Sequence, residues 1–195
     1  MILILMEVDI MEILGRYLIS SLFACCLISC KEAPEYINKN SKFLNLRKIP
    51  ALFNNKPING FVYDLYPNGD TLSTGFYKNG LKSGVWKIYY NGAILKESRE
   101  FKKGKRQGFY LGFYENGAKN FSFSFLDDEY NGTNIIWAKN GKKIEEHNYL
   151  GGYERGVQKT WYLNGKIKSN YIIKNNRRYG LLGTKNCVNV SDEVF

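Results

Sequence analysis

Hydrophobic and polar positions recur along the chain with a period of 24 residues. Short runs such as GFYLGFYENG, residues 108–117, hold large aromatic or apolar side chains and end at an Asn-Gly pair. A second run follows each pair, and in AKNFSFSF, residues 118–125, phenylalanine alternates with a polar residue. Alternation with a period of two is typical of a β-strand with one buried face. The pattern therefore predicts a series of β-hairpins.

Four columns of residues keep the 24-residue interval, which identifies an internal repeat. One column is glycine, at positions 60, 84, 108, 132, 156 and 180. Another is aromatic or apolar: Tyr77, Phe101, Phe125, Tyr149 and Ile173. The last two are adjacent in sequence: Leu65, Tyr89, Phe113, Trp137 and Trp161, followed by Tyr66, Tyr90, Tyr114, Ala138 and Tyr162. Four columns in phase predict five repeats between residues 60 and 179.

Two kinds of turn join the predicted strands. The Asn-Gly pairs are expected to supply two positive-φ positions to a tight hairpin turn. The second turn is expected four residues before each column glycine, at positions occupied by residue types that tolerate a left-handed conformation: Gly80, Gly104, Asp128, Gly152 and Asn176. In the second repeat, Asn91 and Gly92 come one residue early, which predicts a turn shortened by one residue.

The repeats predict an all-β fold, an antiparallel meander of hairpins. Residues 49–59 are expected to form a half-repeat cap, residues 60–179 the five repeats, and residues 180–195 a C-terminal cap, because terminal units of an array are atypical. Residues 30–48 are rich in lysine and asparagine and are expected to be a tether. One column is expected to stack as a core ladder along the sheet: Leu65, Tyr89, Phe113, Trp137 and Trp161.

The N-terminal 29 residues have the pattern of a signal peptide. The apolar run YLISSLFACCLIS, residues 17–29, is too short to span a membrane, which needs about 20 residues. Leu27, Ile28, Ser29 and Cys30 resemble a bacterial lipobox, in which the cysteine is lipidated. Cys30 is therefore the expected lipid anchor. Lys31 after it resembles lipoproteins of the outer membrane, so the expected location is the bacterial cell envelope.

The charge balance favours acidic partners. Removal of residues 1–29 takes away one arginine and three acidic residues, leaving 27 basic and 15 acidic side chains, or a net charge of +12. Such a surface attracts acidic proteins, anionic lipid headgroups or acidic polysaccharides. Nucleic acid fits the charge but is not an expected partner outside the cytoplasm. Cys187 would be the only unmodified cysteine left, so no internal disulfide is expected.

The columns resemble the MORN repeat in its bacterial variant, the YwqK-like antitoxin family. The clearest unit is GVWKIYYNGAILKESREFKKGKRQG, residues 84–108, and the resemblance covers residues 52–180. It implies an elongated, twisted antiparallel sheet that acts in protein or lipid binding, with a toxin as one possible partner. Only Trp86 fills the usual tryptophan position, and Ala138 interrupts the tyrosine column.

Catalytic chemistry is not expected. The glycines have turn spacing and form no phosphate-binding loop. His147 is the only histidine, so it cannot complete a zinc site and is assigned a structural strand position. Asp127, Asp128 and Glu129 lie in a predicted turn and are assigned to solvent rather than to Ca²⁺. We therefore expect no enzyme, no cofactor and no metal.

Tyrosine side chains are the expected partner-binding residues, because tyrosine is enriched at protein interfaces. The candidates are the members of the second aromatic column, which equally suit a structural role: Tyr66, Tyr90, Tyr114 and Tyr162. The leading hypothesis is a protein-binding scaffold. Glycan binding by aromatic stacking is an alternative, although Trp86, Trp137 and Trp161 lie within strands in only three repeats. Anionic lipid binding by the basic face is another.

Overall fold

The structure, a computed structural model, describes residues 33–183. All regular secondary structure in this range is β-strand, and no helix within it is long and apolar enough to cross a membrane. The predicted signal peptide and Cys30 lie outside the described residues, as does the predicted C-terminal cap from residue 184 onward.

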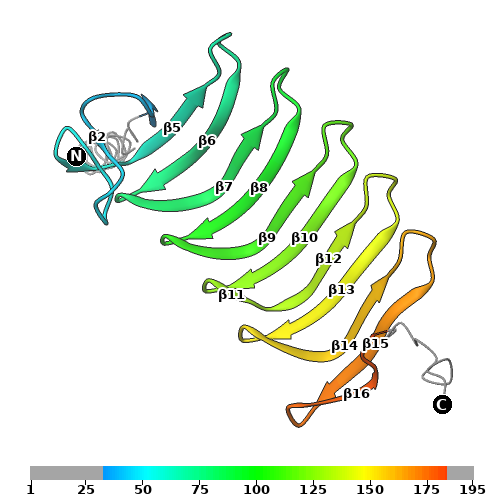
Figure 1. Cartoon of the computed structure of the whole chain (residues 1–195). Helices are drawn as coiled ribbons and strands as arrows, with labels where there is room; N and C mark the ends of the chain where they lie inside the picture. Colours follow the sequence, from blue (N-terminus) through cyan, green and yellow to red (C-terminus); the bar gives the residue numbers. More distant parts are fainter. Residues whose placement is uncertain (1–32, 184–195) are drawn as a thin grey trace, which may run out of the picture. The chain divides into compact units, whose positions relative to one another are not determined.

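The main sheet contains 13 strands. They are β1 (Glu35–Asn38), β5 (Gly60–Leu65), β6 (Thr71–Lys78), β7 (Leu81–Tyr89), β8 (Leu95–Lys102), β9 (Lys105–Phe113), β10 (Lys119–Leu126), β11 (Glu129–Tyr130), β12 (Gly132–Trp137), β13 (Lys143–Leu150), β14 (Tyr153–Trp161), β15 (Ile167–Lys174) and β16 (Arg177–Leu181). From β5 to β16 the strands follow one another in chain order, and β11 pairs only with β10. The predicted all-β meander of hairpins is confirmed (Figure 1).

The N-terminal cap contains residues that the sequence assigns to a tether. β1 pairs in parallel with β5, from Glu35 opposite Gly60 to Asn38 opposite Tyr63, so the sheet is not entirely antiparallel. A separate three-stranded sheet is formed by β2 (Leu44–Asn45), β3 (Leu52–Phe53) and β4 (Lys56–Pro57). The tether prediction is therefore wrong for the strand residues of 35–45, which belong to the folded cap.

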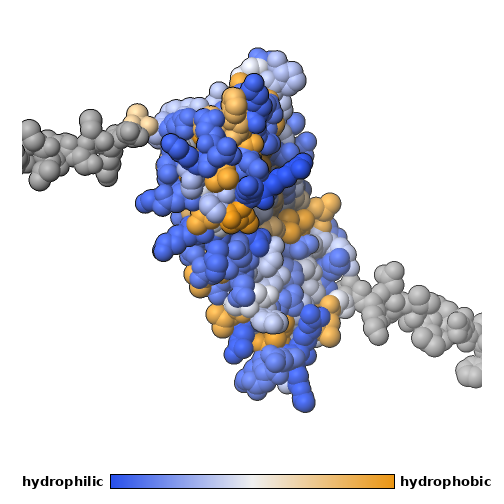
Figure 2. Space-filling model, turned by 90° about the vertical axis from the view of Figure 1, so that its left-hand side faces the viewer, coloured by the Kyte–Doolittle hydropathy of each residue, from blue (hydrophilic) through white to orange (hydrophobic). Residues whose placement is uncertain are grey.

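The hydrophobic core lies at this capped end of the sheet. Its fully buried members come from the cap and from the first hairpin: Ile37, Ala51, Ile58, Val62 and Tyr77. Leu44, Phe53 and Trp86 pack against them. The expected ladder of Leu65, Tyr89, Phe113, Trp137 and Trp161 is not the core, because these residues are partly exposed and their rings make no ring contact with one another among the described residues. Figure 2 shows hydrophobic patches interspersed with hydrophilic side chains.

The Asn-Gly turns differ from the prediction at asparagine. Gly117 has a φ of 79°, but Asn116 does not have a positive φ. The loop has three residues, because Tyr114 N–H donates to Ala118 O while Gly117 N–H donates back to Tyr114 O. Asn116 instead accepts the Ala118 N–H at its side-chain oxygen, at 3.1 Å. A type I turn followed by a left-handed glycine has this arrangement.

The second set of turns is confirmed and has the two positive-φ residues. In each turn the predicted residue and the one before it are left-handed, as in Lys103 (51°) with Gly104 (86°) and Asn175 (51°) with Asn176 (58°). Asp127 and Asp128, at 50° and 75°, form the equivalent turn between β10 and β11. The mirror-image turn expected of Asn-Gly thus occurs at the opposite end of the strands.

The turn of the second repeat is not shortened. Tyr90 N–H donates to Ile94 O, which spans the same three intervening residues as Tyr114 and Ala118 one repeat later. The early Asn91-Gly92 pair changes the conformation of this loop instead of its length, because Gly92 and Ala93 are both left-handed. The 24-residue phase is therefore kept continuously through the turn.

Candidate binding face

A row of paired residues crosses the main sheet from β5 to β15 on one face. Directly opposed residues of neighbouring strands point to the same side. The pairs include Val62 with Gly75, Trp86 with Arg99, Tyr110 with Phe123, and Gln158 with Tyr171. We call this set the transverse row: Val62, Gly75, Trp86, Arg99, Tyr110, Phe123, Asn134, His147, Gln158 and Tyr171.

The column glycines create the bulges beside this row. Between β8 and β9, Arg99 pairs with Tyr110 and Phe101 pairs with Arg106. The single residue 100 of β8 therefore lies opposite residues 107–109 of β9. Gly108 lies in the longer segment with a φ of 69°, which other residues adopt only with strain. Bulges bend strands, and Figure 1 shows β7, β9 and β14 curving along their length. The repeat glycine thus shapes each strand as well as marking the repeat.

Row side chains replace main-chain hydrogen bonds that the bulges remove. Gln158 is fully buried, accepts the Asn148 N–H at 3.1 Å, and donates to the carbonyls of Asn148 and Arg155 at 2.9 and 3.1 Å. Asn134 accepts the Ser124 N–H at 2.8 Å. At the equivalent position, Trp86 donates its indole N–H to Phe76 O at 3.2 Å. Gln158, Asn134 and Trp86 thus each supply a side-chain hydrogen bond to the main chain beside a bulge.

Aromatic rings fill the face around the row. Trp86 makes edge contacts with Tyr77 and Phe101, with centroids 5.1 and 6.1 Å apart. Its indole also lies directly over Gly75, where any side chain would overlap it. A second group of rings is centred on the β9–β10 hairpin and continues to β13: Tyr110, Phe121, Phe123, Phe125, Tyr130, Tyr149 and His147.

Cationic side chains lie over these rings. The Lys82 ammonium is 4.6 Å from the centroid of Trp86, and the guanidinium carbons of Arg99 and Arg106 are 4.2 and 4.3 Å from Tyr110 and Phe125. Toward the C-terminal end, Arg178 lies over Tyr171 at 5.3 Å. Three of these cations are also paired with carboxylates: Arg99 with Glu97, Arg106 with Asp128 and Arg178 with Glu154. Lys82 has no carboxylate at ion-pair distance within residues 33–183, so its charge over the aromatic rings is suited to an anionic group.

Arg99, Tyr110 and Glu97 form a polar cluster within this face. Arg99 Nη2 donates to Glu97 Oε2 at 2.6 Å and to the Tyr110 hydroxyl at 2.7 Å, and this hydroxyl donates to Glu97 at 3.0 Å. Burial raises the pKa of Tyr110, and its hydrogen bond to Glu97 raises it further. The phenol therefore stays protonated and fixes the guanidinium over its own ring.

His147 has the strand position that the sequence predicts. It lies in β13, and its Nδ1 is 3.0 Å from Gln158 Oε1. Glu145 and Glu154 approach the imidazole at 3.7 Å each. Between Ala33 and Gly183, no group of three or more His, Cys, Asp or Glu side chains is arranged to hold a metal ion. Asp128 lies in its predicted turn and pairs with Arg106 at 3.1 Å.

The predicted tyrosines connect successive repeats. Tyr66, Tyr90 and Tyr114 donate their hydroxyls to the carbonyls of Tyr89, Phe113 and Trp137, at 2.8, 3.1 and 2.9 Å. Each acceptor lies 23 residues further along the chain. Tyr162 is partly exposed, with Lys168 6.0 Å from its ring centroid. The structure thus gives three of the four a role in joining repeats, and their role in partner binding remains a prediction.

Replacing Tyr114 with phenylalanine should lower the free energy of unfolding by about 1 kcal/mol, since it removes one hydrogen bond and leaves Trp137 O without that donor. Urea denaturation followed by circular dichroism measures the change. Tyr153→Phe is the matched control, because Tyr153 is 81% exposed and its hydroxyl makes no hydrogen bond within the described residues. Equal stability of the two variants would refute the inter-repeat role.

The tyrosines on the aromatic face are different residues, which the sequence analysis did not assign to partner binding. Tyr77 and Tyr149 belong to a repeat column, whereas Tyr110 and Tyr171 lie 24 residues from Trp86 and His147 in the transverse row. The signal that could have found them is the interval of alternately 11 and 13 residues between paired positions of the row. Strand alternation alone does not reveal it, because each bulge resets which residues share a face.

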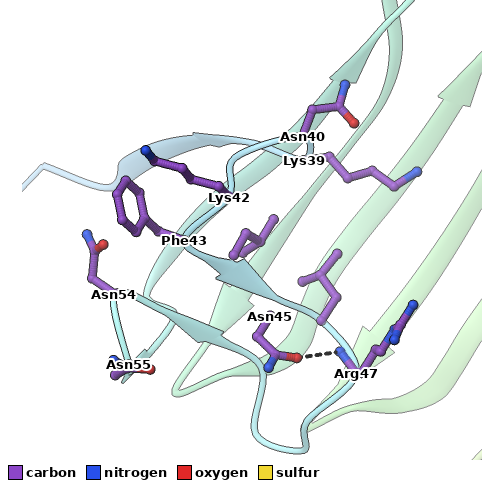
Figure 3. Close-up of a pocket in the computed structure, with 10 residues that line it drawn as sticks. Lys39, Asn40, Lys42, Phe43, Asn45, Arg47, Asn54 and Asn55 are labelled. Carbon is purple, nitrogen blue, oxygen red and sulfur yellow. Dashed lines mark hydrogen bonds between the residues drawn. The ribbon is translucent and has the colours of Figure 1, made fainter.

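Cavities formed by described residues lie in the cap and where the cap meets the sheet. One of about 790 Å³ is open and is formed by the cap loops (Figure 3). Lys39, Lys42 and Arg47 line it together with four asparagines. Lys39 is paired with Asp64 at 2.8 Å. Two more, of about 370 and 230 Å³, adjoin each other between the cap and strands β6–β9.

No protein-family model and no curated protein matches this chain. Among solved structures, it is similar to a mutant of the S. aureus protein TarM in complex with fondaparinux, α-GlcNAc-glycerol and UDP. The identity is 13% and the TM-score 0.34, over 56% of this chain and 21% of the other. The chain thus spans about a fifth of that protein, and a similarity this low carries no functional argument.

Proposed function

We propose that this protein is a non-catalytic scaffold of the MORN type that binds an acidic partner protein on its aromatic face. The observation that carries the proposal is the placement of Lys82, Arg99, Arg106 and Arg178 over aromatic rings across the width of the sheet. Aromatic rings and arginine are enriched where proteins bind each other. The extended hairpin array offers a continuous surface for such a partner.

The location and partner belong to the same proposal. A lipid anchor at Cys30 would hold the scaffold at the bacterial outer membrane, and the resemblance to the YwqK-like family suggests a toxin as the partner. Occlusion by the sheet would then neutralise the toxin without any chemical reaction. A basic binding face is consistent with the net charge of +10 of the whole chain.

A photo-crosslinking experiment tests which face binds. Benzoylphenylalanine would replace Phe123 on the aromatic face or Phe109 on the opposite face, where the side chain is 59% exposed. Irradiation of envelope fractions should give a protein adduct at position 123 that disappears in high salt, because charge attraction is screened. A third variant at Tyr162 tests the predicted tyrosine column separately.

Adducts at position 109 but not at 123 would overturn the assignment of the face. Adducts at neither position, with both variants folded and present in the envelope, would contradict protein binding by the sheet. Glycan or anionic lipid binding by the same face is the alternative. It is tested by retention on cell-wall polysaccharide or on vesicles under the same conditions.

A further inference from the structure

The two adjoining cavities share one lysine. Leu46, Tyr77 and Lys82 line both of them. The larger is formed where the cap segment around residues 46–51 lies against the turns at Gly80 and Gly104. Main-chain hydrogen bonds hold this arrangement, because Ala51 N–H donates to Gly80 O at 2.8 Å and Gly80 N–H donates to Ile58 O at 2.8 Å. The cavity is thus built into the cap junction.

The charged residues that line the larger cavity are all positive. Lys48, Lys82, Lys103 and Lys105 line the larger cavity, and no acidic residue does. Within residues 33–183, none of the four has a carboxylate at ion-pair distance. The surrounding half of the sheet is also basic, since residues 34–108 contain 14 lysines and arginines against 5 acidic residues. The wall of this cavity therefore carries four lysines and no acidic residue.

Lys82 is the least solvated of these groups. Its ammonium lies between the rings of Trp86 and Phe101, at 4.6 and 5.0 Å from their centroids. Burial lowers the pKa of Lys82, and the positive charge of Arg99 lowers it further. Arg99 lines the smaller cavity, and its Nε is buried with no hydrogen-bond partner. Arg99 is already paired with Glu97 at 2.6 Å, so Lys82 is the half-buried cation that has no carboxylate partner among the described residues. Burying such a charge costs free energy unless an anion neutralises it.

The remaining walls are apolar. Leu46, Ala51, Leu81 and the ring of Tyr77 line the larger cavity beside the four lysines. A volume of about 370 Å³ is in the range of small-molecule sites. Lysine ammonium groups bind phosphate as point charges, through several charge-assisted hydrogen bonds. The chemistry of the lining therefore suits a ligand with one highly charged end and one apolar end.

We propose that this cavity binds a small organic phosphate, with the phosphate among Lys48, Lys82, Lys103 and Lys105 and the apolar body against Leu46 and Leu81. The site goes beyond the protein-binding role proposed above and does not depend on it. Phosphate in this position would also compensate the charge of Lys82 over Trp86.

Titration of the purified full chain with phenyl phosphate tests the site. The readouts are tryptophan fluorescence, to which Trp86 contributes beside Trp137 and Trp161, and the thermal midpoint, which a ligand of the folded state raises. Ionic strength is held constant with sodium chloride. Phenyl phosphate should bind more tightly than inorganic phosphate, because only the former has an apolar body. Lys82→Met should weaken phenyl phosphate binding at least tenfold, since it removes a charged donor but keeps the apolar stem.

Lys119→Met is the matched control. Lys119 also lies over a tryptophan ring, 5.7 Å from that of Trp137, but does not line the cavity. Phenyl phosphate should bind Lys119→Met as tightly as the wild type. Lys82→Met relieves a buried charge, so its thermal midpoint without ligand should not fall, and a lost titration signal cannot be attributed to unfolding. A second variant, Lys48→Gln with Lys105→Gln, tests the rim of the cavity.

Vesicles containing phosphatidylglycerol identify the source of the phosphate. If Lys82→Met loses binding to vesicles while phenyl phosphate binds neither the wild type nor any variant, the phosphate belongs to a lipid headgroup. Loss of phenyl phosphate binding assigns it to a soluble compound. If Lys82→Met and the wild type behave alike in both arms, the site is refuted. The crosslinking at Phe123 and Phe109 is measured independently, so failure of one proposal leaves the other testable.

Discussion

Replacing Gln158 with leucine should lower the free energy of unfolding by about 3–5 kcal/mol. Gln158 is fully buried and makes hydrogen bonds to the Asn148 N–H and to the carbonyls of Asn148 and Arg155. Leucine has a similar volume but satisfies none of these groups, and each buried polar group left without a partner costs about 1–3 kcal/mol. Urea denaturation of the full chain, followed by circular dichroism, measures the loss.

The control for this prediction is Gln107→Leu. Gln107 is the other glutamine of the chain, lies in β9, and makes no hydrogen bond through its side chain within residues 33–183. Its replacement should change stability by no more than about 0.5 kcal/mol. If both variants lost the same small amount, the bulge would not depend on a side chain that replaces main-chain bonds.

Replacing Gly80 with alanine should cost about 2–4 kcal/mol. Gly80 has a φ of 71°, which costs alanine about 1 kcal/mol. Its added Cβ would also overlap Pro50 and the main chain of Ala51, where the cap is hydrogen-bonded to the turn. Overpacking against a well-packed site costs a further 1–3 kcal/mol. Relief of this overlap requires movement of the cap away from the sheet.

Gly152→Ala isolates the strain of the backbone conformation. Gly152 holds the same place in its repeat, with a φ of 80°, and the nearest atoms to an added Cβ are 3.9 Å away. This variant should lose only about 1 kcal/mol. Denaturation gives both values, and limited proteolysis of the segment around residues 46–51 reports whether the cap has moved. Equal losses would mean that the cap is not tightly docked on this turn.

The repeat could be predicted from the sequence because it rests on short-range chemistry. Phe121, Phe123 and Phe125 alternate as a strand should, and residues that tolerate left-handed geometry mark the second set of turns. The Asn-Gly turns were harder to predict. A two-residue and a three-residue loop can contain the same pair, and the length depends on the register of the strands, here fixed by Tyr114 and Ala118.

Long-range features of the fold had no comparable signal. Glu35–Asn38 is only four residues long, and its pairing with β5 depends on residues 25 positions further along the chain. The transverse row was missed because each bulge breaks the alternation on which face assignments depend. Gln158 and Asn134 are ordinary polar residues in the sequence. Only the bulge makes them replacements for main-chain hydrogen bonds.

The position of the core has a consequence for how the array comes apart. The largest cluster of fully buried side chains lies at the cap, whereas hairpins further along hold each other through edge-to-edge pairing and ring contacts. In such arrays the strength of each unit depends only on its immediate neighbours. Fraying should therefore start at β16 and progress one hairpin at a time toward the N-terminal strands, and amide protons should exchange with solvent along that gradient. The cap is therefore the most stable end of the array, and the remaining hairpins extend from it.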